Sequence, residues 1–102
     1  MSRLQIKSTI TLPQSASLFN DVTPAIQTKL QEYIDAGTLF STPRVNTTND
    51  DGTKTIVITS IWQDQTTYDE YRSYLTDNYL AINSEWHSKY SINIEVESTE
   101  VE

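Results

Sequence analysis

The order of hydrophobic patterns along the chain is the feature that most constrains its fold. Residues 4–12 alternate between apolar and polar side chains, as a strand does, and residues 24–36 then repeat with helical spacing. Two more strand patterns, at residues 39–47 and 54–62, flank a turn, and a second helical pattern leads to a last strand at residues 92–96. The 102 residues therefore predict the order strand, helix, strand hairpin, helix, strand.

Local signals predict where these elements begin and end. Pro24 fits the first position of a helix, and Gly37 fits the residue that ends one. Pro43 lies within the second strand, which indicates a sheet edge because proline has no N–H to donate to a neighbouring strand. Residues 67–70 match a capping box and predict the start of the second helix. We expect this helix to break near residues 76–78, since a continuous helix would greatly exceed the strands in length.

The third strand carries apolar side chains on both of its faces. Ile56, Ile58 and Trp62 share one face, whereas Val57 and Ile61 lie on the other. A strand that is apolar on both sides needs cover on both sides, and one layer of helices covers only one. We therefore expect the face that includes Val57 and Ile61 to be covered by a partner.

The charge of the chain excludes several classes of partner. Fourteen acidic and seven basic residues give a net charge of −7, and the basic residues are scattered. Binding to nucleic acid or to an anionic membrane needs a basic surface, so neither partner is expected. No apolar segment has membrane-spanning length, and the first residues lack the apolar core of a signal peptide. These features predict a cytoplasmic protein with one domain over residues 1–102, ending in an acidic tail at residues 97–102.

The sequence also lacks the residues from which common metal and nucleotide sites are built. There is no cysteine and only one histidine, so a zinc site is not expected. The only glycines are Gly37 and Gly52, which is too few for a glycine-rich phosphate-binding loop. We therefore predict neither a metal nor a cofactor.

The predicted order of elements corresponds to the ferredoxin-like α+β fold, in which helices cover one face of an antiparallel sheet. Residues 56–71 also resemble the strand-to-helix segment of the dimeric α/β-barrel superfamily, which includes the antibiotic-biosynthesis-monooxygenase-like proteins. In that segment a central strand ends in an aromatic residue, here Trp62. A helix then begins with two aromatic residues three positions apart, here Tyr68 and Tyr71. The resemblance implies a homodimer whose two sheets pack face to face.

That superfamily includes cofactor-independent monooxygenases, haem-degrading enzymes, muconolactone-isomerase-like proteins and stress-response proteins, so the resemblance does not name an activity. The haem-degrading members carry an Asn on the first strand, a Trp early in the second main helix and a His about ten residues later. The first strand here has no Asn, and the other two positions fall on Tyr71 and Ala81. The resemblance therefore does not extend to haem degradation.

Aromatic side chains on the third strand and the second helix are the candidate ligand-binding residues. Tyr68, Tyr71 and Trp86 recur at helical spacing together with Leu75 and Ile82, and this stripe fits either a core or a pocket lining. Trp62 has the same two interpretations, as a core anchor or as a pocket wall. The candidate pocket residues are Trp62, Tyr68, Tyr71 and Trp86.

The candidate catalytic residues are Tyr71 and the single histidine, His87. A general base needs an orienting partner, and the sequence neighbours of His87 supply none, so a surface position near the end of the helix is the alternative.

Three functions of different classes remain open at this level. The first is binding of a small apolar or aromatic molecule, or of a partner protein, without catalysis. The second is a cofactor-independent monooxygenase or isomerase of the same fold. The third is an interaction module like the accessory proteins of phages, which the Thr-, Ser-, Asn- and Tyr-rich composition resembles.

Overall fold

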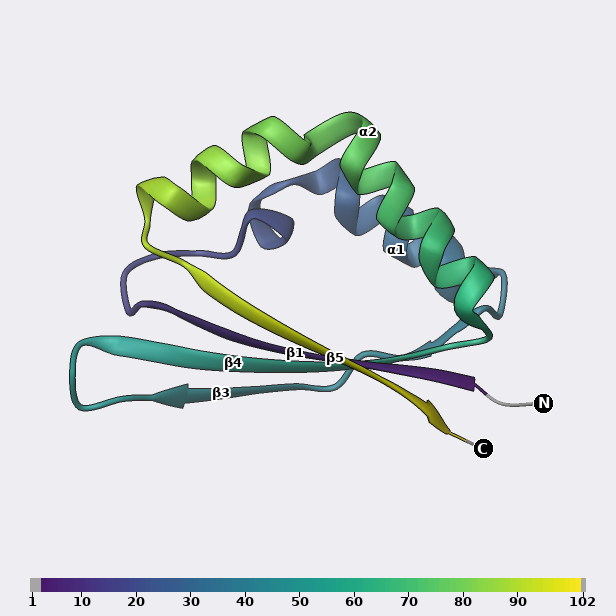
Figure 1. The fold of residues 1–102 in the computed structure, drawn as a ribbon, viewed down its shortest axis with the longest axis horizontal. Coiled ribbons are helices and arrows are strands. Elements are labelled where there is room, and N and C mark those ends of the chain that lie inside the picture. The colour runs from purple at the N-terminus through teal and green to yellow at the C-terminus, as the bar shows by residue number, and fades with distance from the viewer. Residues whose placement is uncertain (1–2, 102) are drawn as a thin grey trace.

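The computed structural model describes residues 3–101 and contains a five-stranded antiparallel sheet with its helices on one face (Figure 1). The elements follow in the order β1 (Arg3–Pro13), η1 (Phe19–Val22), α1 (Pro24–Asp35), β2 (Leu39–Ser41), β3 (Arg44–Thr48), β4 (Thr53–Trp62), α2 (Gln65–Lys89) and β5 (Asn93–Val101). The strand order is β2-β4-β1-β5, and β3 also pairs with β4. This is the predicted ferredoxin-like arrangement, and the prediction of fold class is confirmed.

The alternation of apolar and polar residues in β1 determines which of its side chains lie on the inner face of the sheet, the face that the helices cover. Leu4, Ile6, Ile10 and Leu12 are all buried beneath the helices, as the two-residue period predicts. β4 runs beside β1 in a register that places Trp62 opposite Leu4. Two apolar rows therefore lie next to each other at the centre of the sheet.

The second predicted strand is divided in two at Pro43. β2 and β3 both pair with β4, but the register shifts between Leu39 and Ser41, and Pro43 lies in the gap between the two strands. Its carbonyl still accepts a hydrogen bond of 3.0 Å from the N–H of Thr59. The prediction of an edge position at Pro43 is confirmed, whereas the single strand over residues 39–47 is wrong.

The second helix begins earlier than the predicted capping box and does not break. Asp64 is its N-cap, and its carboxylate accepts a hydrogen bond of 2.9 Å from the N–H of Thr67. The helix then continues through residues 76–78 to Lys89. Its 25 residues span about 37 Å at the usual rise, and an 11-residue strand such as β1 also spans about 37 Å. Because the strands are longer than predicted, an unbroken helix fits the sheet.

The helix is nevertheless bent in its middle, so that it arches over the sheet (Figure 1). The side-chain amide of Asn78 donates a hydrogen bond of 2.8 Å to the carbonyl of Tyr74, one turn earlier. Side-chain hydrogen bonds to the helix backbone commonly accompany such bends. The segment predicted to break is therefore the place where the helix has a local irregularity.

The predicted acidic tail is also wrong over the described residues. Residues 97–101 belong to β5, which pairs with β1 as far as Arg3 and Val101. The strand continues because β1 offers a full row of backbone partners along this edge. The last tail residue, Glu102, lies outside the described part of the chain.

The hydrophobic core consists of two clusters at opposite ends of the sheet. One contains Ile10, Leu12, Ala16, Leu18, Ile56 and Ile92, with Ile58, Trp86 and Tyr90 packed against it. The other contains Leu4, Ile6, Leu39, Trp62 and Tyr71, with Leu30, Tyr33, Tyr68 and Leu75 packed against it. The two ends of α2 therefore pack on different clusters.

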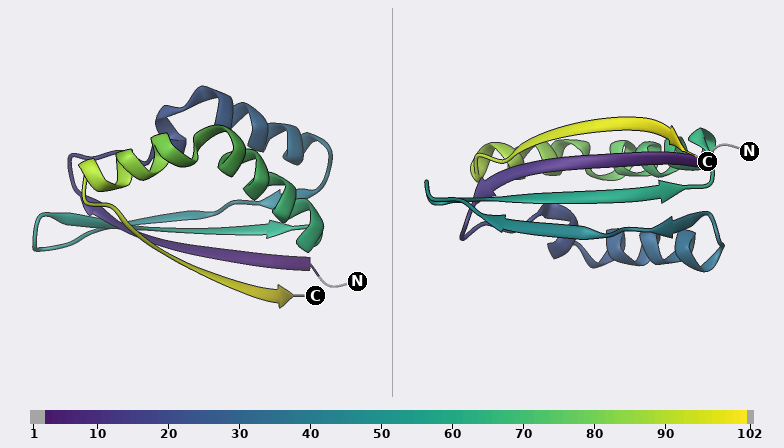
Figure 2. Two further views of the ribbon diagram at one scale, coloured as in Figure 1. Left: turned by 45° about the horizontal axis from the view of Figure 1, so that its top comes forward. Right: turned by 90° about the horizontal axis from the view of Figure 1, so that it is seen from below.

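The outer face of the sheet is not covered by any helix of the described residues, as the view from below in Figure 2 shows. Val57 and Ile61 lie on this face, because Ile56, Ile58 and Trp62 occupy the alternate inner positions of β4. Val45 is paired with Val57 on the neighbouring strand and is 62% exposed. None of the helices in residues 3–101 has both the length and the apolarity needed to cross a membrane.

We predict that Ser91→Gly stabilises the protein. Ser91 follows the C-cap of α2 with φ of 54°, in the left-handed region that glycine adopts without steric cost. Relief of this strain should raise the free energy of unfolding by up to about 1 kcal/mol, after the greater entropy of the unfolded glycine variant is subtracted.

The control is Ser84→Gly, at an exposed position inside α2, where glycine should lower the free energy of unfolding by about 0.5 kcal/mol. Urea denaturation measures both. A loss of stability in both variants would contradict the left-handed conformation of Ser91.

We predict that Asp64→Ala lowers the melting temperature at neutral pH but not in acid. Hydrogen bonds from the backbone N–H and the hydroxyl of Thr67 lower the pKa of Asp64. The carboxylate therefore contributes its full stabilisation above the unfolded-state pKa of about 3.9, and loses it as pH falls through the lower folded-state pKa.

Differential scanning fluorimetry should show a gap between wild type and Asp64→Ala at pH 7 that closes towards pH 2. Asp64→Asn keeps an acceptor at the N-cap without a titrating charge, so it should remain near the wild type at pH 7. A gap of constant size across this range would show that the ionised carboxylate is not what caps the helix.

Candidate functional site

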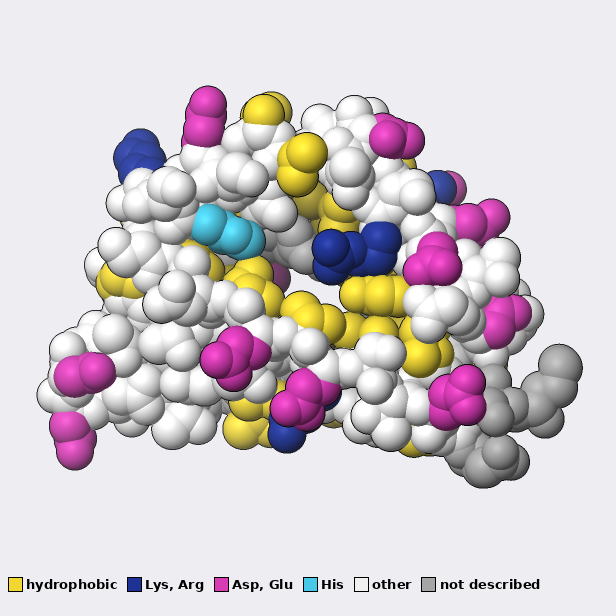
Figure 3. All heavy atoms as spheres, viewed as in Figure 1, with side chains coloured by type: hydrophobic (Ala, Val, Ile, Leu, Met, Phe, Trp, Pro, Cys, Tyr) yellow, Lys and Arg dark blue, Asp and Glu magenta, His cyan; other side chains and the backbone are white. Residues whose placement is uncertain are grey.

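The candidate site is a cavity of about 480 Å³ between the inner face of the sheet and the arch of α2. Figure 3 shows it as a hollow with apolar side chains inside it and with a basic side chain and the histidine at its edge. Side chains from all five strands and from η1, α1 and α2 line it. Ile94 and Val96 of β5 belong to this lining and remain 40% and 46% exposed, so the cavity opens beside β5.

The cavity lies where the two core clusters do not meet. Ile10 and Leu18 from one cluster line it together with Ile6, Leu39 and Trp62 from the other. The helix packs on each cluster near one of its ends, and its middle bends away from the sheet (Figure 1). The cavity is therefore a consequence of how α2 is anchored.

Two serines interrupt the apolar rows that form the floor of the cavity. Ser8 is an inner-face residue of β1, between Ile6 and Ile10, and Ser60 is an inner-face residue of β4. They lie on adjacent strands, since Ser8 is paired with Ile58 and Ile6 with Ser60. Small side chains at these two positions leave space that isoleucine or leucine would fill.

Trp62 forms an aromatic wall at one end of the cavity. It is 1% exposed and stacks on Tyr71 with ring centroids 5.4 Å apart. Tyr33 and Tyr68 contact it edge-to-face at 5.4 and 5.6 Å. Its ring N–H donates a hydrogen bond of 3.0 Å to the hydroxyl of Ser60. Trp62 is thus both a core anchor and a lining residue, which combines the two interpretations of the sequence.

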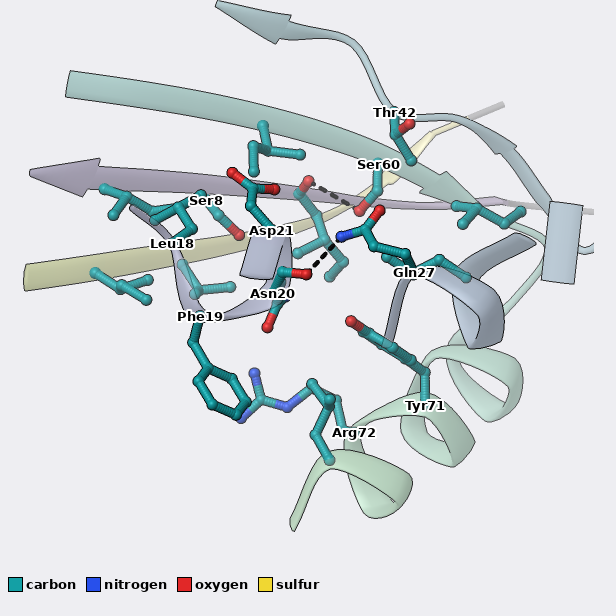
Figure 4. A pocket seen from close by; sticks show the side chains of 18 of the residues that line it. Ser8, Leu18, Phe19, Asn20, Asp21, Gln27, Thr42, Ser60, Tyr71 and Arg72 are labelled. Atoms are coloured by element: carbon teal, nitrogen blue, oxygen red, sulfur yellow. Dashed lines mark hydrogen bonds between the residues drawn. The ribbon is translucent and has the colours of Figure 1, made fainter. Parts of the chain in front are cut away.

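Tyr71 and Arg72 are adjacent residues of α2 that both extend towards the cavity (Figure 4). The ring of Tyr71 is buried, and this burial raises the pKa of its phenol well above the ordinary value. The hydroxyl therefore stays protonated at neutral pH and can donate a hydrogen bond. The Arg72 guanidinium is a permanently charged donor.

An ion pair closes the opposite side of the cavity. The Arg44 guanidinium of β3 donates to both carboxylate oxygens of Asp21 in η1, at 3.0 and 2.8 Å. The side-chain amide of Gln27 donates a hydrogen bond of 2.6 Å to the carbonyl of Asn20 (Figure 4). These contacts hold η1 against β3 and the start of α1, so this wall is fixed by polar contacts.

Asn83 and His87 lie one helical turn apart on α2, and both line the cavity. The side-chain oxygen of Asn83 is buried and has no hydrogen-bond partner among the described residues. Partial burial lowers the pKa of His87 below its ordinary value, which favours the neutral ring at neutral pH. Within residues 3–101 no carboxylate lies within salt-bridge distance of His87, so the orienting partner that a general base requires is missing there.

The structure brings most of the predicted site residues together. Trp62, Tyr68, Tyr71 and His87 all line the cavity. Trp86 does not line it; its ring N–H donates a hydrogen bond of 2.9 Å to the carbonyl of Ser17, and its ring packs on the other core cluster.

The predicted apolar stripe on α2 includes one residue that does not face the sheet. Ile82 is 55% exposed, whereas its neighbour Asn83 lines the cavity. The predicted dimer residues Val57 and Ile61 lie on the opposite face of the sheet from the cavity.

Sequence reasoning identified His87 but missed the other polar members of the site. Arg72 lies four residues after Tyr68, and Asn83 lies four residues before His87, so both extend a helical stripe that already contains these two residues. A search for apolar residues alone passes over this stripe. Two signals together could have indicated the cavity. One is a helical stripe that contains both apolar and polar residues, and the other is a serine within each of two apolar strand rows.

The described residues contain no group of three His, Cys, Asp or Glu side chains that could hold a metal ion. The polar groups that face the cavity are hydrogen-bond donors, acceptors and one separate cation. This arrangement can bind and orient a small molecule.

Comparison with known proteins supports the fold and leaves the activity open. No protein-family model matches the sequence, and none of the curated proteins is similar to it. The chain is similar in structure to a dimeric ferredoxin-like protein from an uncultured marine organism, with a TM-score of 0.71 and 13% sequence identity. The similarity covers 99% of this chain and 96% of that protein. The part of the chain that the structure describes therefore has the ferredoxin-like fold.

Proposed function

We propose that the protein is a homodimeric ferredoxin-like protein that binds a small apolar or aromatic molecule in the cavity beneath α2. The observation that carries this proposal is the cavity itself. Its volume of about 480 Å³ lies within the range of about 300–1,000 Å³ that is usual for small-molecule sites. Such sites combine apolar walls with a few polar groups, and here Trp62 and Ile58 accompany Tyr71 and Arg72.

Two features support binding without catalysis over the monooxygenase or isomerase alternative. His87 has no carboxylate partner in the described residues, so nothing there orients it as a base. The Tyr71 phenol has a raised pKa, which opposes its use as a phenolate nucleophile or base at neutral pH. A binding role needs neither group to change its protonation state.

The uncovered outer face of the sheet supports the homodimer. Val45 and Val57 are cross-strand partners on this face, and Ile61 lies further along the same strand. The structurally similar marine protein is itself dimeric and has the same fold over nearly its whole length. A second copy of the chain placed sheet to sheet would remove these apolar side chains from water.

We predict that charge on the outer face abolishes the dimer. Val57→Glu would bury a carboxylate without a partner at the proposed interface, which disfavours association strongly. Val45→Glu tests the same face at a more exposed position, where the folded protomer tolerates the change. Native mass spectrometry should show a dimer for the wild type and a monomer for both variants.

The matched control is Leu80→Glu, which adds the same charge at an apolar position on α2 that is 60% exposed. This variant should remain dimeric. A monomeric wild type, or dimers that persist in Val45→Glu and Val57→Glu, would contradict the sheet-to-sheet arrangement.

We predict that filling the cavity weakens binding of a neutral aromatic probe. Ser8→Phe places a phenyl ring on the cavity floor, and naphthylacetamide should then bind at least about tenfold more weakly, because apolar contacts worth about 1.4 kcal/mol or more are lost. Nuclear magnetic resonance titration measures the affinity and checks that the variant is folded.

Ser73→Phe makes the same change on the exposed surface of α2, outside the cavity, and should leave the affinity unchanged. Equal affinities in all three proteins would place the probe elsewhere and contradict the proposed site.

A further inference from the structure

We infer that the natural ligand of the cavity is an amphipathic monocarboxylate, whose carboxylate pairs with the Arg72 guanidinium and whose apolar body lies against the Trp62 wall. This inference rests on the proposed ligand-binding function and specifies its chemical class.

The first argument is the distribution of charge around the cavity. The chain carries a net charge of −7, yet the charged lining residues are two arginines, Arg44 and Arg72, and one aspartate, Asp21. Arg44 and Asp21 form a bidentate pair and neutralise each other. The cavity is therefore left with one positive charge, that of Arg72, in a chain that is acidic overall.

The second argument is that Arg72 has no internal counter-ion in residues 3–101, although a carboxylate is near in sequence. Asp69 lies three residues before Arg72 on α2, a spacing at which helical ion pairs form. Its carboxylate instead accepts a hydrogen bond of 2.8 Å from the side-chain amide of Gln65. The Arg72 guanidinium extends towards the cavity (Figure 4).

The third argument is the type of anion that these groups fit. A guanidinium binds a planar carboxylate through two parallel hydrogen bonds. The Tyr71 hydroxyl, protonated because burial raises its pKa, adds a neutral donor from the adjacent residue. A phosphate dianion would need a second cation, but Arg44 is paired and burial favours the neutral form of His87. One separate cation matches a monoanion.

The fourth argument is the shape of the remaining lining. The floor and walls include Ile10, Ile58, Leu75 and Trp62, which favour an apolar body. Trp62 stacks on Tyr71, and Arg72 is the next residue, so the aromatic wall and the cation are supplied by neighbouring parts of the site. A ligand with a carboxylate on a short arm from an aromatic ring satisfies both parts.

Three probes with the same aromatic body test this inference: naphthylacetate, naphthylacetamide and naphthylethylamine. They carry a negative, a neutral and a positive group. Titration calorimetry on the full-length protein should give naphthylacetate an affinity at least about tenfold above that of the amide, since charge-assisted hydrogen bonds are markedly stronger than neutral ones. The amine should bind most weakly.

Arg72→Gln removes the charge at an exposed position of α2 and should leave the protein folded. In this variant naphthylacetate should lose about tenfold in affinity, while naphthylacetamide should stay within about twofold of its wild-type value. Lys89→Gln makes the same charge change on the same helix but outside the cavity lining, and it should change neither affinity appreciably.

The outcomes separate this inference from the proposed function. If the amide binds as tightly as the acetate and Ser8→Phe weakens both, the cavity binds ligands but the carboxylate assignment is wrong. If Lys89→Gln reduces acetate affinity as much as Arg72→Gln, the effect is one of overall charge and the assignment is again wrong. If none of the probes binds in the cavity, the proposed function itself fails.

Discussion

The structure of the inner face depends on one constraint: a long helix packs on the sheet near its two ends, while its middle contacts η1 through the edge-to-face pair Tyr79 and Phe19, whose ring centroids are 5.8 Å apart. Near its start, Tyr71 stacks on Trp62 at the end of β4, and near its end Trp86 donates a hydrogen bond to the carbonyl of Ser17. Each anchor belongs to a separate core cluster. Because both anchors are fixed by aromatic packing, the bend in the middle of α2 lifts the helix away from the sheet and leaves the cavity.

Much of the fold was predictable because it follows from local chemistry. The alternation in β1 gives its buried face, and Gly37, with φ of 79°, ends the turn after α1 as its position in the sequence indicates. The continuous course of α2 was not predictable, since it depends on the length of strands that are defined only by their pairing. β5, for example, extends to Val101 because β1 pairs with it that far, although its acidic sequence resembles a tail.

The candidate site was predictable for its large aromatic residues and for the single histidine, His87. Trp62, Tyr68 and Tyr71 were identified because large side chains on the buried faces of two predicted elements must meet. Arg72 and the other polar lining residues were missed for a physical reason. Whether Arg72 lies over solvent or over a cavity depends on the path of α2 above the sheet, and tertiary contacts such as the stacking of Tyr71 on Trp62 help to set that path. Helical spacing alone places Arg72 beside the stripe without revealing what the stripe faces.

The composition of the cavity floor argues that the space is a feature of this sequence and not a packing defect. Protein cores are close-packed, and an unfilled volume of this size forfeits many contacts. β-branched residues at Ser8 and Ser60 would fill part of it and would suit the strands better. The hydroxyl of Ser60 instead accepts a hydrogen bond from the ring N–H of Trp62, and the small side chain of Ser8 leaves space on the cavity floor beside it. Both exceptions fall on the inner rows and beneath the arch of α2, which is the arrangement that the proposed ligand-binding function requires.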